Sequence, residues 1–200
     1  MNALRHWFEL IPDYHRGPHE PHEERKSLAD LDSNQCLVGH FGEPGYFIEH
    51  RYPEFWQARF ARYRYRVFAF VREPLDMRCS LYRHHTQHTE QAAGMTLAEH
   101  IMTQPNYISC IMNLTRENYL EVLDKYFFIG LFEDLQPGFD LLSQRLKLPR
   151  IELPMRNLTT KNAANDRAVL TDQEIDAFRQ QNQLDYLVYQ YVRDRYAELR

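Results

Sequence analysis

The chain has 200 residues, of which 44% are hydrophobic and 14% aromatic, and its formal net charge is −4 at pH 7. This length predicts a single domain over residues 1–200, and the negative charge argues against a nucleic-acid-binding protein, which is normally basic. No apolar run reaches membrane-spanning length, and the first residues lack the apolar core of a signal peptide. The three cysteines, Cys36, Cys79 and Cys110, have no disulfide or zinc-site spacing, which indicates a reducing compartment and predicts a cytoplasmic protein.

The first third of the chain contains a predicted helix and a predicted short strand. Apolar residues between Leu4 and Ile11 recur at i, i+3, i+4 and i+7, which predicts an amphipathic helix that begins at Met1. The strand is followed by Gly39 and His40, so a histidine is expected at its carboxyl end. The other expected elements of this region are a loop over 13–26, the strand itself over 35–38, a loop over 43–53 and a short helix over 53–62.

The most informative segment follows. Residues 67–71 form an uninterrupted run of β-branched and aromatic side chains, which predicts a strand buried on both faces of a parallel sheet. Arg72 comes next, and Pro74 suits the first position of a helix that continues to Arg83. A strand, a short loop and a helix direct main-chain N–H groups and the helix dipole towards an anion. Arg72 adds a planar, permanent cation and Ser80 a hydroxyl, so we predict a phosphate-binding corner; the alternative is that Arg72 is an ordinary surface residue.

The second half of the chain alternates predicted helices with one further strand. Thr96 with Glu99, and Thr171 with Glu174, have the spacing of a capping box and predict two helix starts. Strands that alternate with helices predict an α/β fold with a parallel sheet flanked by helices. The expected elements are helices over 96–102, 114–126 and 134–148, a strand over 127–131, a helix after 171, and a last helix whose apolar face is Leu184, Leu187, Val188, Tyr191 and Val192.

Three polar residues are expected at one edge of the predicted sheet. His40, Arg72 and Glu133 each follow a predicted strand, and the carboxyl ends of parallel strands meet at the edge where ligands bind in α/β proteins. His40 is the best candidate for a general base, because an unperturbed imidazole is available as the neutral form near physiological pH. The alternative is a structural histidine that is hydrogen-bonded to the backbone.

Two further groups of residues give weaker hypotheses. Thr159, Thr160 and Lys161 form a polar loop that can close over a phosphate or a ribose, and a solvated loop is an equal alternative. Histidines with the spacing of zinc or nickel ligands occur at positions 15, 19 and 22 and at positions 84 and 88. Because no His-Glu-x-x-His motif is present, no metal is expected.

The segment FVREPLDMRCSLYRH (70–84) resembles the second cofactor-binding motif of sulfotransferases that use 3′-phosphoadenosine 5′-phosphosulfate (PAPS), and most of all that of carbohydrate 2-O-sulfotransferases. In that family a strand-end Arg and a helix Ser eight residues later hold the 3′-phosphate of PAPS, which implies this role for Arg72 and Ser80. Gly39-His40 is similar to the family's Gly-His motif, whose His is the proposed base. Further similar segments are FFIGLFEDLQPGFDLLSQRLKLP (127–149), LDYLVYQYVRDRY (184–196) and LPMRNLTTKNA (153–163), the last of which resembles a loop near the nucleotide and implies contacts from Thr159, Thr160 and Lys161.

The sequence departs from the family pattern in two places. Met77 stands where the family usually has an Arg, which here comes one place later as Arg78. The strand and the Pro-Lys-x-Gly-Thr-type loop that cradle the 5′-phosphosulfate have no counterpart, and the Lys of that loop would stabilise the bridging oxygen during transfer. The resemblance therefore implies a P-loop-NTPase-like sulfotransferase fold that is truncated at its N-terminus.

Two functional hypotheses follow from the resemblance. In the first, the chain transfers a sulfuryl group from PAPS to a hydroxyl acceptor, a carbohydrate or a small molecule, and the Arg-rich stretch 51–66 faces an anionic acceptor such as a glycan. No metal, nucleic acid or membrane takes part. In the second, the chain is a non-catalytic remnant that binds a nucleotide, another anion or a protein, and its unpaired sheet edge favours a homodimer.

Overall fold

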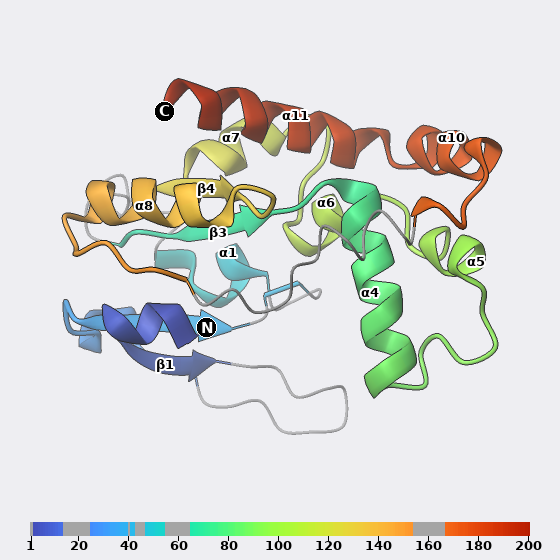
Figure 1. Cartoon of the computed structure of the whole chain (residues 1–200). Helices are drawn as coiled ribbons and strands as arrows, with labels where there is room; N and C mark the ends of the chain where they lie inside the picture. Colours follow the sequence, from blue (N-terminus) through green and yellow to red (C-terminus); the bar gives the residue numbers. More distant parts are fainter. Residues whose placement is uncertain (1, 14–24, 40, 43–46, 55–64, 154–166) are drawn as a thin grey trace. The chain divides into compact units, whose positions relative to one another are not determined.

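A computed structural model describes residues 2–13, 25–39, 41–42, 47–54, 65–153 and 167–200 (Figure 1). It shows a mixed α/β protein, as the sequence predicts. The strands are β1 (Glu9–Asp13), β2 (Gln35–Gly39), β3 (Phe68–Val71) and β4 (Phe128–Leu131). The helices are η1 (Asn2–His6), η2 (Leu28–Asp30), α1 (Ile48–Arg51), α4 (Pro74–His88), α5 (Leu97–Ile101), α6 (Tyr107–Ile111), α7 (Tyr119–Asp124), α8 (Leu135–Leu146), α10 (Asp172–Gln181) and α11 (Gln183–Glu198).

The chain divides into two compact units. The first comprises residues 1–69, 110–128 and 136–154, and the second comprises residues 70–109, 129–135 and 155–200. The described strands pair as two sheets of two parallel strands each, β1 with β2 and β3 with β4. Both strands of the second sheet begin in the first unit and end in the second, so their carboxyl ends belong to the second unit.

The predicted N-terminal helix is wrong beyond its first turn. A short 3₁₀ helix ends at His6, and the chain then enters strand β1, which runs parallel to β2 in a register from Glu9↔Gln35 to Asp13↔Gly39. Helical spacing is a local signal, whereas these main-chain bonds come from a segment distant in sequence, and such tertiary pairing overrides local preference. Pro12 is tolerated in β1 because a strand with one hydrogen-bonded neighbour leaves its outer N–H positions unused.

Trp7 fixes the point at which the N-terminal helix ends. Its indole ring packs against Phe139 of α8, with 5.9 Å between ring centroids, and its Nε1–H donates to the carbonyl oxygen of Pro149 at 2.7 Å. This anchor uses both the apolar body and the polar edge of the side chain, as buried tryptophans usually require. It holds the start of β1 against the segment that carries α8 within the first unit.

Gly39 belongs to the last residue pair of the first sheet, and no side chain fits at this position. A Cβ atom at this position would lie 2.0 Å from the carbonyl oxygen of Asp13 and 2.9 Å from the Phe41 ring. We expect Gly39→Ala to destabilise the first unit by about 3 kcal/mol, since the clash is with backbone that cannot move aside. Gly42→Ala is the control, because its Cβ would meet only the side chain and Cα of Ile111 at 3.0 Å or more. Urea unfolding monitored by tryptophan fluorescence measures the effect. Equal shifts of the urea midpoint in the two variants would contradict this expectation.

The second sheet confirms the two predicted apolar strands. Phe127 N–H donates to the Val67 carbonyl and Phe132 N–H to the Val71 carbonyl, both at 2.8 Å, which sets a parallel register. All four residues of β4 are buried, as the run of apolar residues predicts. In β3 only Val71 is fully buried, so the prediction of burial on both faces holds at its carboxyl end alone.

Side-chain caps explain where the helices begin. The two predicted capping boxes are present, at Thr96 before α5 and at Thr171 before α10. The helix predicted over 114–126 begins only at Tyr119, because the side chains of Thr115 and Asn118 bind main-chain N–H groups of this segment and hold it in a turn. The loop predicted over 43–53 is wrong where α1 forms. The helix predicted over 53–62 lies mostly outside the described residues.

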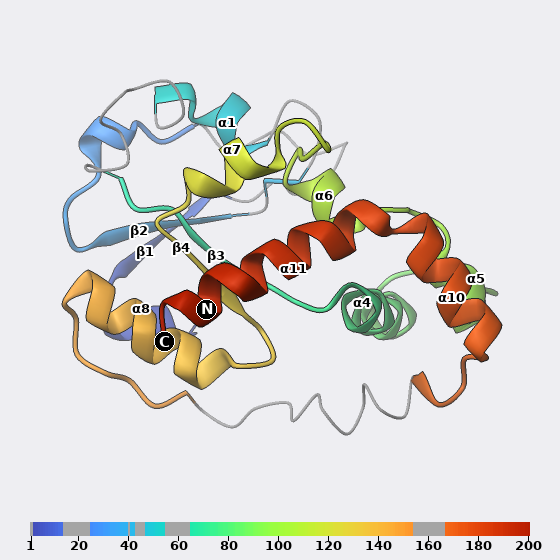
Figure 2. The ribbon, with the colours of Figure 1, turned by 90° about the horizontal axis from the view of Figure 1, so that it is seen from above.

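The core of the second unit is built by α4, α5 and α10 (Figure 2). Its buried members are Leu75, Cys79, Leu97, Ile101, Leu170 and Phe178. Helix α11 buries the predicted apolar face only in part. Val188 and Val192 are fully buried, whereas Leu187 is 37% exposed, and Asp185 is buried as well. The pattern of apolar residues could not show that a carboxylate would be buried to bind main-chain groups of α6.

Candidate functional site

Arg72 lies directly after β3, as predicted, and most of its side chain is buried. The residue is 9% exposed, and its guanidinium carbon stands 5.1 Å from the centroid of the Phe132 ring. Phe132 directly follows β4 and donates its N–H to the carbonyl of Val71, so the two strand ends lie side by side. Within the described ranges of the chain, no carboxylate forms an ion pair with Arg72. The site therefore presents a nearly buried cation backed by an aromatic ring.

The first turn of α4 differs from the predicted anion site. Pro74 occupies the first helical position, as predicted, and Glu73 caps the helix by accepting the Asp76 N–H at 2.8 Å. The Glu73 N–H itself donates to Glu133 Oε1 at 2.7 Å. Two main-chain donors that would favour a phosphate are thus bound by the chain's own carboxylates. These two donors are therefore not available to an anion at this corner.

A second arginine, which the sequence did not single out, stabilises this turn. Arg167 Nη2 forms an ion pair with Glu73 Oε2 at 2.6 Å, and Arg167 Nε donates to Asp76 Oδ1 at 2.7 Å. The Tyr186 hydroxyl donates to Glu73 Oε1 at 3.0 Å, and burial followed by the Glu73 charge raises the pKa of this tyrosine. These partners are far from α4 in sequence, so no local pattern could have found them.

Ser80 lies two turns into α4 and is half-buried. Its spacing places it on the same face of the helix as Asp76 and away from the core-facing residues Leu75 and Cys79. No direct hydrogen bond joins Ser80 to Arg72 among the interactions of the described residues. Glu133, by contrast, does lie next to the residue that follows Arg72, as the predicted strand order implies.

The remaining predicted site residues lie outside the described residues. They are His40, Thr159, Thr160 and Lys161. Described residues of the first unit, Asp13 before His40 and Arg51 and Tyr52 after it, do form a buried polar group. Asp13, at the end of β1, accepts hydrogen bonds from Arg51 Nε at 2.7 Å, from Arg51 Nη2 at 2.5 Å and from the Tyr52 hydroxyl at 2.5 Å.

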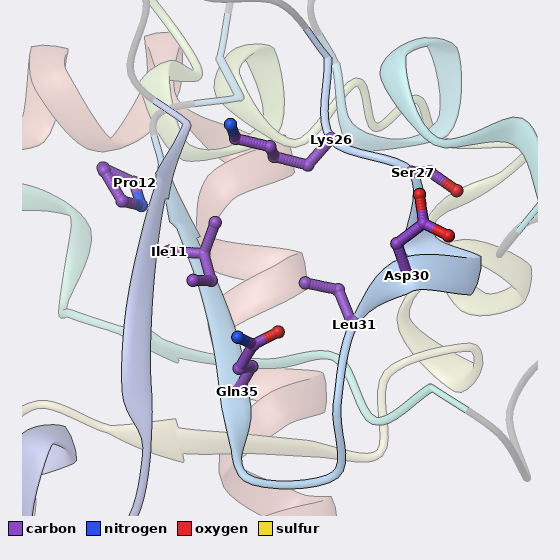
Figure 3. A pocket seen from close by; sticks show the side chains of 7 residues that line it. All are labelled: Ile11, Pro12, Lys26, Ser27, Asp30, Leu31 and Gln35. Atoms are coloured by element: carbon purple, nitrogen blue, oxygen red, sulfur yellow. The ribbon is translucent and has the colours of Figure 1, made fainter.

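The first unit also contains an open cavity of about 360 Å³ (Figure 3). Its described lining residues are Ile11, Pro12, Lys26, Ser27, Asp30, Leu31 and Gln35, from β1, from the start of β2 and from the segment around η2. The side-chain amide of Gln35 is already bonded to the Asp32 N–H and to Glu9. The described lining includes neither Arg72 nor Ser80.

Neither a metal-binding cluster nor a membrane-spanning helix is found in the described ranges. A search of those ranges finds no cluster of three or more His, Cys, Asp and Glu side chains arranged to bind a metal ion. The histidines at positions 15, 19 and 22 lie outside the described residues. Of the helices in the described parts of the chain, none combines the length and the apolar character that crossing a membrane requires.

Comparison of the chain with family models, with curated proteins and with solved structures finds no match. The site must therefore be interpreted from its own geometry.

Proposed function

We propose that Arg72 binds the 3′-phosphate of a nucleotide and that the chain is a sulfotransferase, which transfers a sulfuryl group from PAPS to a hydroxyl acceptor. The observation that carries the proposal is the nearly buried guanidinium at the end of β3, which has no carboxylate partner among the described residues. A buried charge is costly unless it is paired, so this position favours binding of an anion. The planar fork of Arg suits a phosphate.

The other roles in this proposal come from the resemblance to PAPS-dependent sulfotransferases. Ser80 would donate its hydroxyl to the same 3′-phosphate, and Thr159, Thr160 and Lys161 would contact the nucleotide. His40 would take the proton of the acceptor hydroxyl as its oxygen attacks sulfur in line. The parallel strand pairs and the strand-to-helix step at Arg72 are compatible with the P-loop-NTPase-like fold that the resemblance implies.

One observation favours the second function, a non-catalytic anion-binding or protein-binding remnant. The charged groups around the first turn of α4 are the arginines Arg72 and Arg167 and the carboxylates Glu73, Asp76 and Glu133. The carboxylates outnumber the arginines, and they already bind two main-chain donors of this turn. Such an arrangement binds a highly charged anion more weakly than a site built from arginines alone would.

Titration calorimetry with adenosine 3′,5′-bisphosphate tests the proposal. Wild-type protein is expected to bind this product of PAPS, and Arg72→Ala is expected to lose about 2 kcal/mol of binding free energy, roughly 30-fold in affinity. Arg150→Ala is the control, because Arg150 is exposed and lies in the other unit. No binding by wild type, or unchanged affinity in Arg72→Ala, would reject the role of Arg72.

Incubation with PAPS and a mixture of carbohydrate and small hydroxyl acceptors separates the two functions. Sulfated product from wild-type protein supports the enzyme. Binding of adenosine 3′,5′-bisphosphate without any transfer, over the whole acceptor mixture, supports the non-catalytic alternative.

A further inference from the structure

Two histidines of the second unit meet across the interface between α4 and α5. His85 Nδ1 lies 3.0 Å from His100 Nε2, and the ring centroids are 5.1 Å apart. His100 is only 3% exposed, whereas His85 is half-buried. A hydrogen bond between two imidazoles needs one bare ring nitrogen as the acceptor, so the contact survives only while at least one of the rings is neutral.

Among the described residues, the groups that face this pair are positively charged or neutral. Arg78 of α4 donates from Nη2 to the His100 carbonyl at 2.7 Å and to Thr103 Oγ1 at 2.9 Å. Arg78 is 2% exposed, and its Nε and Nη1 atoms are buried without a hydrogen-bond partner among the described residues. His84, also on α4, stands beside His85 with 6.1 Å between ring centroids. A second positive charge on the pair would therefore be added next to a cation that is already incompletely compensated.

The other elements packed here offer little compensation. The Tyr82 ring lies 5.2 Å from the His100 ring, and the Tyr107 ring of α6 lies 5.2 Å from the Arg78 guanidinium. From α11, the carboxylate of Asp185 faces Arg78, but it already accepts three hydrogen bonds from α6. The side chains that α10 adds to this core are apolar, namely Ile175 and Phe178.

The protonation equilibria agree with this geometry. Burial, then Arg78 and then His85, lower the pKa of His100 from 6.5 to about 4. Burial, then His84 and then Arg78, lower the pKa of His85. An opened state with solvated imidazoles has ordinary pKa values near 6.5 and therefore binds protons first as the pH falls.

We propose that the His85–His100 contact is an acid-sensitive latch that holds α5 on α4, and that protonation of both rings releases α5 and exposes Arg78. The latch is closed above pH 6.5, where both rings are neutral in either state. Below that value each proton taken up only by the open state raises the opening equilibrium about tenfold per pH unit, until the closed state also binds it. For His100 this window extends down to about pH 4.

Amide hydrogen exchange of the full chain between pH 7.5 and pH 5.0 tests the latch, with rates corrected for the intrinsic effect of pH. Protection of residues 96–103 is expected to fall at least about tenfold per pH unit below pH 6.5, whereas protection of α11 stays constant. His100→Phe keeps a ring beside Tyr82 but cannot titrate, so the pH dependence should become clearly weaker, with only His85 of the pair left to titrate. His88→Gln is the control, because His88 is exposed on the same helix.

Two results would overturn the proposal. One is protection of residues 96–103 that does not change with pH in wild type, and the other is an unchanged pH dependence in His100→Phe. If His100→Phe fails to fold, NMR titration of the wild-type imidazoles gives the answer on its own. A His100 that titrates at or above pH 6.5 contradicts the latch, and one that stays neutral until the segment opens supports it.

Discussion

Asp185→Asn is expected to lower the free energy of unfolding of the second unit by about 3 kcal/mol, and Asp185→Ala by about 4 kcal/mol. Asp185 is 2% exposed, and its carboxylate accepts the Ile108 N–H at 2.9 Å, the Ser109 N–H at 2.7 Å and the Ser109 hydroxyl at 2.6 Å. These three donors lie at the start of α6, where helix N–H groups lack partners within the helix. Removal of the carboxylate leaves all three buried and unsatisfied.

The Asn variant distinguishes hydrogen-bond polarity from packing. Asparagine has nearly the same shape, but its NH₂ group would face one of the donors of α6 and could not accept from it. Burial raises the pKa of the Asp185 carboxyl, and the bonds from Ser109 and Ile108 and the Arg78 charge oppose that rise. With three donors directed at its two oxygens, the side chain is matched to the site as the ionised acceptor.

Urea unfolding followed by circular dichroism at 222 nm measures this loss, because the second unit contains the longest helices of the described chain, α4 and α11. The control is Asp194→Asn on α11, an exposed carboxylate that only accepts a hydrogen bond from Gln190. We expect the control to change the stability by no more than about 0.5 kcal/mol. Equal losses for the two variants would show that the buried carboxylate contributes nothing specific.

The elements that the sequence predicted correctly depend on short-range signals. The capping boxes at Thr96 and Thr171 involve residues three positions apart, and β3 and β4 are continuous apolar runs. Strand β1 was missed because its evidence is non-local. The Glu9 N–H donates to the Asn34 carbonyl, and nothing within residues 4–11 indicates that a partner strand lies 26 positions further along the chain.

The candidate site likewise has one part that the local sequence predicts and another that depends on residues distant in the sequence. Arg72 could be placed at a strand end from its immediate neighbours alone. The carboxylate that binds the Glu73 N–H comes from 60 residues away, and the guanidinium on Asp76 from 91 residues away. The sequence therefore predicted where the cation would lie but not that carboxylates would bind the donors of the adjacent helix. That difference decides how much of an anion's binding must come from Arg72.

Asp13→Ala is expected to lower the free energy of unfolding of the first unit by about 4 kcal/mol. Asp13 is 3% exposed, and its carboxylate binds Arg51, whose side chain is 12% exposed, together with the hydroxyl of the 1%-exposed Tyr52. A guanidinium is not deprotonated in proteins, so Arg51 stays charged after the carboxylate is removed. The mostly buried Arg51 guanidinium would lose the charge of Asp13 and two hydrogen bonds.

Tryptophan fluorescence is the appropriate measurement, since Trp7 lies in the first unit and its ring packs against Phe139 of the same unit. Tyr52→Phe removes only one donor of the group and should cost about 1 kcal/mol. The double variant Asp13→Leu/Arg51→Met removes both charges, so it should be clearly more stable than Asp13→Ala, because no uncompensated charge is left behind. If the double variant is instead the least stable, the ion pair itself stabilises the first unit. The loss of stability in Asp13→Ala would then not be due to the charge that remains on Arg51.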